Sequence, residues 1–246
     1  ITLSHTFLHE RLSANAGLRM AGSSLFGTHW IPQAGITASP ADGWNIRGAV
    51  ARGFRNPSFK ELYLYKMANS ELEPEMMTNY EVGVGKTFGP LLSVDLTGYI
   101  SHGSNLIAVL DGKNQNMGEF TNKGVELTIK SKPLKWMGVQ ANYSFMHTDV
   151  DNLTGAPRHQ YYLALDLMPH PKWELHPQLK GANRLFVSQD TDLQNFVLLG
   201  IKASYSPTKW LQLFVTADNL TNAHYCIMKG YEMPGISAQG GFRLNF

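Results

Sequence analysis

Hydrophobic and polar residues alternate with a period of two along most of this chain. In the clearest run, residues 92–100, Leu, Val, Leu, Gly and Ile take the even positions, whereas Ser, Asp, Thr and Tyr take the odd ones. The same alternation recurs over residues 125–130, 139–145, 161–167, 174–180, 197–205 and 211–218. A period of two is that of a β-strand whose faces meet different environments. No segment with a helical period is of comparable quality, so the pattern predicts an all-β chain.

The connections between these runs alternate between short and long. Short connections fall at residues 39–44, 88–90, 131–136, 169–173 and 206–210. Long ones cover roughly residues 54–74, 103–119, 147–157, 185–192 and 219–235. The alternation predicts an antiparallel meander with tight turns at one end and long loops at the other. Outer-membrane β-barrels have this arrangement, with short periplasmic turns and long extracellular loops.

Tryptophan follows four of the five short connections, at Trp44, Trp136, Trp173 and Trp210. Aromatic residues gathered at one end of a set of strands are typical of the girdle at a membrane interface. The alternative is a soluble sandwich with four core tryptophans. We favour the barrel because nearly every strand carries an apolar face, and no second sheet or helix is available to cover them. The predicted fold class is therefore an all-β, antiparallel transmembrane β-barrel.

Composition agrees with this interpretation and excludes some functions. Only 16% of the residues are charged, 11% are aromatic and 23 are glycine, which suits a lipid-facing surface and also many soluble β proteins. The net charge is +2 and no basic run occurs, so nucleic acid is not an expected partner. The single cysteine, Cys226, excludes an internal disulfide framework. No apolar run approaches the roughly 18 residues of a transmembrane helix.

The two ends of the chain suggest that it is part of a larger barrel. Phe242, Leu244 and the last residue, Phe246, alternate with polar residues. A final strand that ends in an aromatic residue resembles the signal read by the barrel assembly machinery, which makes that machinery an expected partner. Counting back gives about thirteen strands, with Ile1 inside one, whereas bacterial barrels have an even number. We therefore expect residues 1–246 to form the C-terminal part of a 22-strand-type barrel, without the N-terminal plug and early strands.

Five short motifs resemble those of the TonB-dependent outer-membrane receptor family. Residues 51–63 (ARGFRNPSFKELY) resemble its GFR-x-P-x-x-x-ELY stretch, and residues 72–75 (LEPE) and 79–83 (NYEVG) resemble its L-x-PE and NYE-x-G block. Residues 122–126 (NKGVE) match N-x-GVE, residues 218–225 contain NL-x-N followed by Tyr225, and residues 230–235 (GYEMPG) precede the last strand. The resemblance implies an energised importer that binds a scarce solute at its loops. Its coupling to TonB would run through the missing N-terminal region.

Two long loops carry the candidate ligand-binding residues. These candidates are Arg55, Tyr63, Tyr65 and Met67 in the first loop, and His224, Tyr225, Met228, Tyr231 and Met233 in the last. Tyrosine offers a rigid apolar body with a polar tip, which suits a bulky chelate. The expected ligand is an iron-siderophore or haem, with cobalamin as the alternative. Packing of the loops against one another would also explain these residues, and a loop-shaping role is favoured for the motif around Asn56 and Pro57.

Other functions find less support in the sequence. No nucleophile–base–acid set, phosphate loop or paired-cysteine motif is apparent, so we expect no enzyme, no bound metal and no cofactor. The charged residues opposite the apolar positions are expected to line a hydrated barrel wall; they include Glu81, Asp95, Glu126, Lys130, Asp166, Glu174, Lys180, Lys202 and Asp218. A passive porin and a non-transporting surface barrel remain alternatives. Expected neighbours are outer-membrane lipid and, as an open alternative, a surface lipoprotein.

Overall fold

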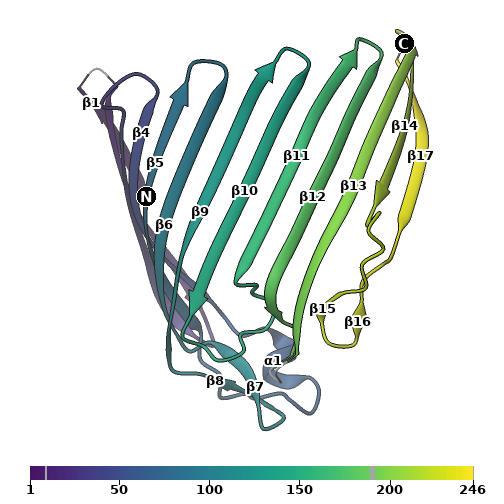
Figure 1. Cartoon of the computed structure of the whole chain (residues 1–246). Helices are drawn as coiled ribbons and strands as arrows, with labels where there is room; N and C mark the ends of the chain where they lie inside the picture. The colour runs from purple at the N-terminus through teal and green to yellow at the C-terminus, as the bar shows by residue number, and fades with distance from the viewer. Residues whose placement is uncertain (9, 189–191, 246) are drawn as a thin grey trace. The chain divides into compact units, whose positions relative to one another are not determined.

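The chain folds almost entirely into β-strands. The computed structural model describes residues 1–8, 10–188 and 192–245. Thirteen strands form one sheet in the order β1-β2-β3-β4-β5-β6-β9-β10-β11-β12-β13-β14-β17 within these ranges. Neighbouring strands are antiparallel from β1 to β4 and from β10 to β17. The predicted all-β antiparallel meander is confirmed (Figure 1).

The strands of this sheet are 6 to 16 residues long. Their bounds are β1 (Thr2–Phe7), β2 (Leu12–Ser23), β3 (Gly27–Ala38), β4 (Trp44–Arg55), β5 (Glu75–Phe88), β6 (Leu92–Ser104), β9 (Glu119–Leu134), β10 (Met137–Thr148), β11 (His159–His170), β12 (Trp173–Phe186), β13 (Leu193–Thr208), β14 (Leu211–Asp218) and β17 (Ser237–Leu244). The chain divides into two compact units. Unit 1 comprises Ile1–Val84, Thr97–Gly124 and His147–Val150, and unit 2 comprises Gly85–Leu96, Val125–Met146 and Asp151–Phe246.

Three small elements lie in the long connections. Helix α1 (Phe59–Tyr63) lies between β4 and β5, the hairpin β7 (Ile107–Leu110) and β8 (Lys113–Asn116) lies between β6 and β9, and the hairpin β15 (Cys226–Met228) and β16 (Tyr231–Glu232) lies between β14 and β17. Because α1 has only five residues, no helix in the described ranges is long and apolar enough to cross a bilayer.

Three of the short connections, β9–β10, β11–β12 and β13–β14, are even shorter than the sequence pattern suggested. Residues 131–134, expected to be part of a turn, extend β9, so only Lys135 and Trp136 connect β9 to β10. Pro133 lies within β9, although proline has no backbone N–H to donate and is therefore unusual inside a central strand. The turn between β11 and β12 is likewise Pro171 and Lys172 alone.

The registers in unit 2 place polar and apolar residues on opposite faces. Residues directly opposite each other on neighbouring strands lie on the same face of the sheet. Lys180 pairs with Tyr162 and Leu198 on one face. Leu179 pairs with Leu163 and Leu199 on the other face. The same registers put five of the predicted wall residues on the first face, namely Asp166, Glu174, Lys180, Lys202 and Asp218. We call this face the polar face of unit 2, and the opposite one its apolar face.

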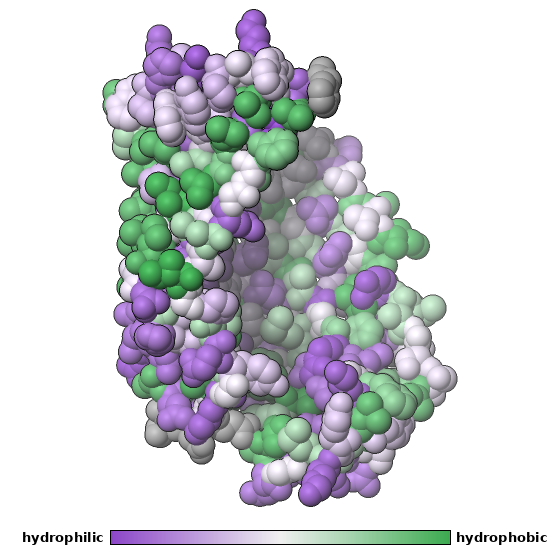
Figure 2. Space-filling view, turned by 90° about the vertical axis from the view of Figure 1, so that its right-hand side faces the viewer, coloured by the Kyte–Doolittle hydropathy of each residue, from purple (hydrophilic) through white to green (hydrophobic). Residues whose placement is uncertain are grey.

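The apolar face is not covered by a conventional core. Leu163, Val197 and Val215 remain 43%, 39% and 47% exposed, although they lie in the middle of long strands. Figure 2 shows hydrophobic residues gathered over the middle of its left-hand side, with hydrophilic residues toward the ends. A contiguous apolar surface of this kind marks a site that meets another apolar phase.

Glycines make room for aromatic rings that lie across neighbouring strands. Gly181 pairs directly with Tyr161, and a Cβ on Gly181 would lie 2.5 Å from that ring. Gly241 pairs in the same way with Phe214, whose ring would lie 2.8 Å from the added Cβ. The missing side chains let each ring lie flat against the sheet, which is a known use of glycine in curved sheets.

Candidate functional site

Helix α1 begins at a capping box. The Ser58 hydroxyl accepts a hydrogen bond from the backbone N–H of Glu61 at 3.4 Å, and the Glu61 carboxylate accepts one from the backbone N–H of Ser58 at 2.6 Å. Two of the unsatisfied N–H groups at the start of the helix therefore gain partners. The preceding Pro57 is buried. The sequence analysis missed this helix, although Ser58-Phe59-Lys60-Glu61 carries the S-x-x-E signature that predicts such a start.

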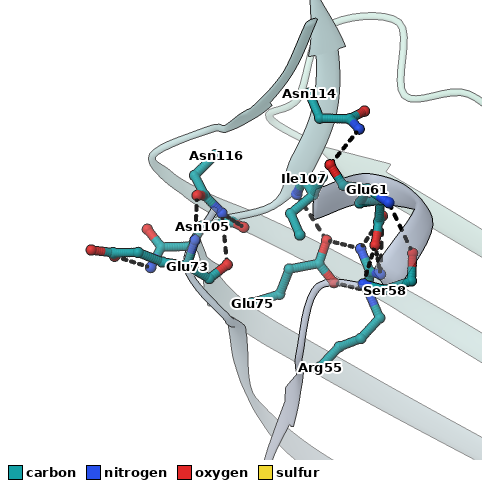
Figure 3. A network of polar contacts seen from close by, with 9 residues as sticks. All are labelled: Arg55, Ser58, Glu61, Glu73, Glu75, Asn105, Ile107, Asn114 and Asn116. Carbon is teal, nitrogen blue, oxygen red and sulfur yellow. Dashed lines mark hydrogen bonds and ion pairs between the residues drawn. The ribbon is translucent and has the colours of Figure 1, made fainter. Parts of the chain in front are cut away.

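Arg55 joins the two ends of the first long loop (Figure 3). Its guanidinium donates three hydrogen bonds of 2.9–3.1 Å to the Glu61 carboxylate and two of 2.5 and 2.8 Å to that of Glu75. Glu75 also accepts a hydrogen bond from the backbone N–H of Ile107 at 2.8 Å. Forked guanidinium–carboxylate pairs are the strongest hydrogen bonds available to side chains. The ligand-binding candidate Arg55 thus has two internal carboxylate partners, which supports the loop-shaping interpretation of its motif.

The carboxylate of Glu61 is held in its charged form. Burial raises the pKa of this group, but hydrogen bonds from Arg55 and from the backbone and hydroxyl of Ser58 outweigh burial and leave the pKa below its ordinary value. The net direction follows from stabilisation of the anion by several donors. The network is therefore complete near neutral pH.

Asparagine side chains fasten the β7–β8 hairpin to the same loop. Asn114 is buried, and its side-chain Nδ2 donates a hydrogen bond to the backbone carbonyl of Glu61 at 3.2 Å. The backbone carbonyl of Asn114 accepts a hydrogen bond from the side-chain Nδ2 of Asn69 at 2.8 Å. Asn116 donates to the carbonyl of Glu73 and accepts from the backbone N–H of Glu73 at 2.8 Å. The two loops of unit 1 form one hydrogen-bonded body, and the sequence analysis did not single out either asparagine.

The aromatic candidates of the first loop lie on the outside of this body. Tyr63 is 50% exposed and Tyr65 is 75% exposed, and the Tyr63 ring lies 5.3 Å from that of Phe59. Met67 is also exposed, and its carbonyl accepts a hydrogen bond from the backbone N–H of Asn114 at 2.7 Å. A cavity of about 590 Å³ in unit 1 is lined in part by Leu62, Tyr63, Leu72, Met76, His29 and Arg52.

In unit 2 the last long loop folds against the ends of β12 and β13. Cys226 packs with Leu185 and Val187 in a small buried cluster, and Phe196 packs against that cluster. The rings of Phe196 and Tyr225 lie 4.3 Å apart. Lys229 forms a 2.8 Å ion pair with Asp192, which lowers the pKa of that carboxyl, and the Lys229 backbone N–H bonds to the carbonyl of Val187.

The start of this loop is shaped by Asn219, which is buried. Its amide nitrogen donates to the carbonyls of Ala223 and Pro234, both at 3.0 Å, and its amide oxygen accepts from Thr221 and from the backbone N–H of Ala223. Asn219 also has a left-handed backbone, with φ of 52°. Asparagine tolerates this conformation and satisfies the turn through its own side chain. These hydrogen bonds give the NL-x-N motif a role in ending β14 and starting the loop.

A cleft of about 630 Å³ lies between the last loop and the sheet of unit 2. Tyr225 and Met233, both predicted from sequence, line it together with Tyr162, Lys180 and Phe196. Glu126 lines it as well. The other candidates of this loop, His224, Met228 and Tyr231, are exposed and do not line the cleft. The volume is within the range of roughly 300–1,000 Å³ that small-molecule sites occupy.

Comparison with known protein families decides the identity of the fold. Residues 3–220 match the family described as TonB dependent receptor-like, beta-barrel, which is most of the chain. The chain belongs to the TonB-dependent receptor family. Its members are outer-membrane transport proteins and not enzymes, so the apolar face of the strands is the lipid-facing one. The resemblance of the five motifs is thereby confirmed at the level of the family.

Solved TonB-dependent receptors share the fold of this one. The ferric enterobactin receptor PfeA of Pseudomonas aeruginosa, as its G324V mutant, matches with a TM-score of 0.77 at 16% identity over 96% of this chain and 43% of that chain. The siderophore receptor PirA of Acinetobacter baumannii matches with a TM-score of 0.78 at 16% identity, over 96% of this chain and 44% of its own. The copper transporter OprC matches with a TM-score of 0.77 at 17% identity, over 100% and 46%.

One curated relative matches in sequence over a shorter stretch. The vitamin B12 transporter BtuB of Vibrio vulnificus (strain YJ016) is 29% identical over 93 residues, which is 38% of this chain and 15% of BtuB. The chain thus spans less than half the length of the receptors it resembles. No group of three or more His, Cys, Asp or Glu side chains placed to hold a metal ion occurs in the described part of this receptor. Phe246, the expected contact for the barrel assembly machinery, lies outside the described residues.

Proposed function

We propose that this chain is part of a TonB-dependent importer of a bulky metal chelate, with an iron-siderophore or haem as the first candidates. The observation that carries the proposal is the cleft in unit 2, where Tyr225 and Met233 from the last loop face side chains of the polar sheet face. An importer needs a ligand site reached from the loop side and lined by the hydrated wall. The cleft supports the proposal, because residues of the last loop line it together with Tyr162 and Lys180 of the polar face.

The residues around the cleft suit a ligand with a large rigid body and a polar edge. Tyr162, Phe196 and Tyr225 offer aromatic surface, and Lys180 and Glu126 offer one charge of each sign. A few placed polar groups within an apolar lining are the usual composition of a small-molecule site. Tyrosine hydroxyls can remain hydrogen-bonded while their rings contact the ligand.

The exposed residues of the first loop supply a second contact surface in this proposal. Tyr63, Tyr65 and Met67 project from a body fastened by Arg55 and the asparagines, so little conformational entropy is lost when a ligand binds them. The exposed Tyr231 would act from the last loop in the same way.

Cobalamin is the alternative ligand with a specific observation in its favour. A relative found by sequence is a vitamin B12 transporter, whereas the siderophore and copper receptors match at 16–17% identity and support the fold alone. A copper ion would fill only a small part of the cleft of about 630 Å³. The thioether group of Met233 is nevertheless a soft ligand of the kind that copper(I) prefers. A passive porin or a non-transporting barrel would have no use for a saturable loop-side site.

The proposal also names the partners of the transport step. Coupling to TonB would use a segment outside this chain, and assembly would use the barrel assembly machinery at the C-terminal strand. A surface lipoprotein could deliver the ligand to the exposed aromatic loops. Each of these partners is inferred from family membership.

Binding of three probes to the full-length receptor tests the ligand assignment. Ferric enterobactin, haemin and cyanocobalamin would each be titrated against the wild type and a variant with Tyr63, Tyr65 and Tyr231 changed to Ala. We expect one probe to bind saturably and its Kd to rise at least tenfold in the variant, while the barrel stays folded. Tyr80→Ala, at a tyrosine that is 51% exposed on β5, is the matched control and should leave Kd unchanged. Equal affinity in wild type and triple variant would remove these tyrosines from the site.

A further inference from the structure

Three short turns of unit 2 repeat one dipeptide. Lys135-Trp136 connects β9 to β10, Lys172-Trp173 lies where the β11–β12 turn meets the start of β12, and Lys209-Trp210 connects β13 to β14, each 37 residues after the one before. The spacing equals one up-and-down pair of strands, so the repeat returns to the same end of the sheet. In Figure 1 these turns lie at one end of unit 2, opposite the β15–β16 hairpin.

The tryptophans of this repeat are exposed at the turn end of the strands of unit 2. Trp136, Trp173 and Trp210 are 46%, 43% and 57% exposed. Trp173 pairs with Tyr205, which shares a face with Val197 and Leu199, and the two rings stack 4.6 Å apart. Indole rings placed at the edge of an apolar band take up the headgroup level of a bilayer.

The turns of unit 2 and the strand ends beside them carry an excess of positive charge. Residues 85–92, 131–137, 169–173 and 206–211 contain no Asp or Glu and five lysines, namely Lys86, Lys132, Lys135, Lys172 and Lys209. The short turn of unit 1 at residues 39–44 instead contains Asp42 and no basic residue. The charge is therefore a property of the unit 2 turns and does not follow from turn chemistry alone.

Three of these lysines are available to bind an anion outside the protein. Lys132, Lys135 and Lys209 are exposed, and none of the three forms an ion pair with a carboxylate of the described residues. Lys172 joins two turns through a 3.0 Å hydrogen bond from Nζ to the carbonyl of Pro207, and Lys86 lies over the Phe88 ring. Long lysine side chains at a membrane edge extend their ammonium groups toward the headgroups.

We propose that the Lys–Trp turns of unit 2 form a binding belt for the headgroups of anionic phospholipids in the periplasmic leaflet. The charge complementarity identifies the occupant, since each turn places an ammonium group beside an indole at the edge of the lipid-facing sheet. Short turns face the periplasm in this class of barrel, so the periplasmic leaflet is the one in reach. The inference rests on membership of the family and holds for any imported ligand.

The expected effect per lysine follows from membrane electrostatics. One lysine near an anionic surface favours association about fivefold at moderate ionic strength. Removal of three such lysines should therefore lower the preference for anionic over zwitterionic lipid by up to about a hundredfold. The effect should shrink as salt is added, because the charges are exposed to solvent.

Lipid-specific quenching of tryptophan fluorescence tests the belt. The full-length receptor is reconstituted into phosphatidylcholine bilayers that contain either brominated phosphatidylglycerol or brominated phosphatidylcholine, and the relative lipid-binding constant is obtained from the quenching. Wild type is compared with the Lys132→Gln, Lys135→Gln, Lys209→Gln variant. The matched control is Lys66→Gln, Lys113→Gln, Lys123→Gln, which removes the same charge from exposed positions of unit 1.

The expected result is stronger quenching by phosphatidylglycerol in wild type and in the control, and loss of that preference in the turn variant. Heat-modifiable gel migration reports whether each variant is folded, so a folding failure is separated from a change in lipid preference. Equal quenching by both lipids in wild type would overturn the proposal. Competition of the effect by inorganic phosphate at millimolar concentration would also overturn it, because it would indicate a site for free anions.

Discussion

Arg55 joins two carboxylates that lie 14 residues apart in the sequence. Its five hydrogen bonds to Glu61 and Glu75 close the first long loop at its base, and Glu75 passes the connection on to the β7–β8 hairpin. The side chain of Arg55 is 47% exposed, so solvent weakens the ion pairs, but the shared geometry of several charged hydrogen bonds retains part of their strength. At the scale of the residue, the hydrogen bonds of Arg55 hold in place the loop that carries the exposed tyrosines Tyr63 and Tyr65.

Replacing Arg55 with Gln should loosen the first loop without unfolding the sheet. We expect a loss of about 1–2 kcal/mol in the local opening free energy, because two carboxylates lose their charged donors. Hydrogen exchange of the amides of residues 58–69 should become roughly tenfold faster. Arg243→Gln on β17 is the control, and its exchange in this loop should equal that of wild type. Unchanged exchange in the Arg55 variant would show that the network does not hold the loop.

The lowered pKa of Glu61 gives this fastening a pH dependence. A carboxyl whose pKa is lower in the folded loop than in the open one stabilises the closed loop above its ordinary pKa of about 4.3. That contribution is lost as pH falls through the lowered folded-state pKa. Loop protection, measured by hydrogen exchange corrected for intrinsic rates, should therefore be constant from pH 7 to about 5 and fall below 4. Glu61→Gln should abolish this acid dependence, and a pH profile identical to wild type would contradict the assignment.

At the scale of the element, the structure separates what local sequence determines from what the folded chain adds. Strands such as β13 were predictable because alternation is a local signal, and α1 was predictable from its capping box. The Arg55–Glu75 ion pair was not predictable, because it forms only when the long loop brings the end of β4 and the start of β5 together. The cleft in unit 2 could not be predicted from the sequence either, because it exists only once the hairpin has folded onto the sheet. Tyr225 and Met233, which line it, were nevertheless predicted as ligand-binding candidates.

The β15–β16 hairpin is anchored by a small apolar cluster, and Cys226 reports on it. Leu185 is only 2% exposed and packs against Cys226, the one cysteine of the sequence. Leu185→Ala removes buried contacts that are typically worth 2–5 kcal/mol. The rate of maleimide labelling of Cys226 should rise at least tenfold in this variant. Leu213→Ala, on the exposed apolar face, should leave the rate unchanged, and equal labelling in all three proteins would mean that the cluster does not hold the hairpin.

At the scale of the whole molecule, the chain belongs to an outer-membrane receptor family, and its unit 2 exposes one apolar and one polar sheet face. Family membership accounts for the sheet, and the exposed Leu and Val residues account for its contact with lipid. The fastened tyrosines and the cleft beneath the last loop account for the proposed capture of a chelate. The proposed import would be coupled to TonB.

Uptake by the full-length receptor, with and without TonB, tests the central claim most directly. Labelled ferric enterobactin, haemin and cyanocobalamin would each be offered to an outer-membrane receptor deletion strain that expresses the protein. The account predicts saturable uptake of one of these probes, abolished when TonB is absent. Uptake that is independent of TonB and rises linearly with concentration would indicate a passive pore and contradict the account.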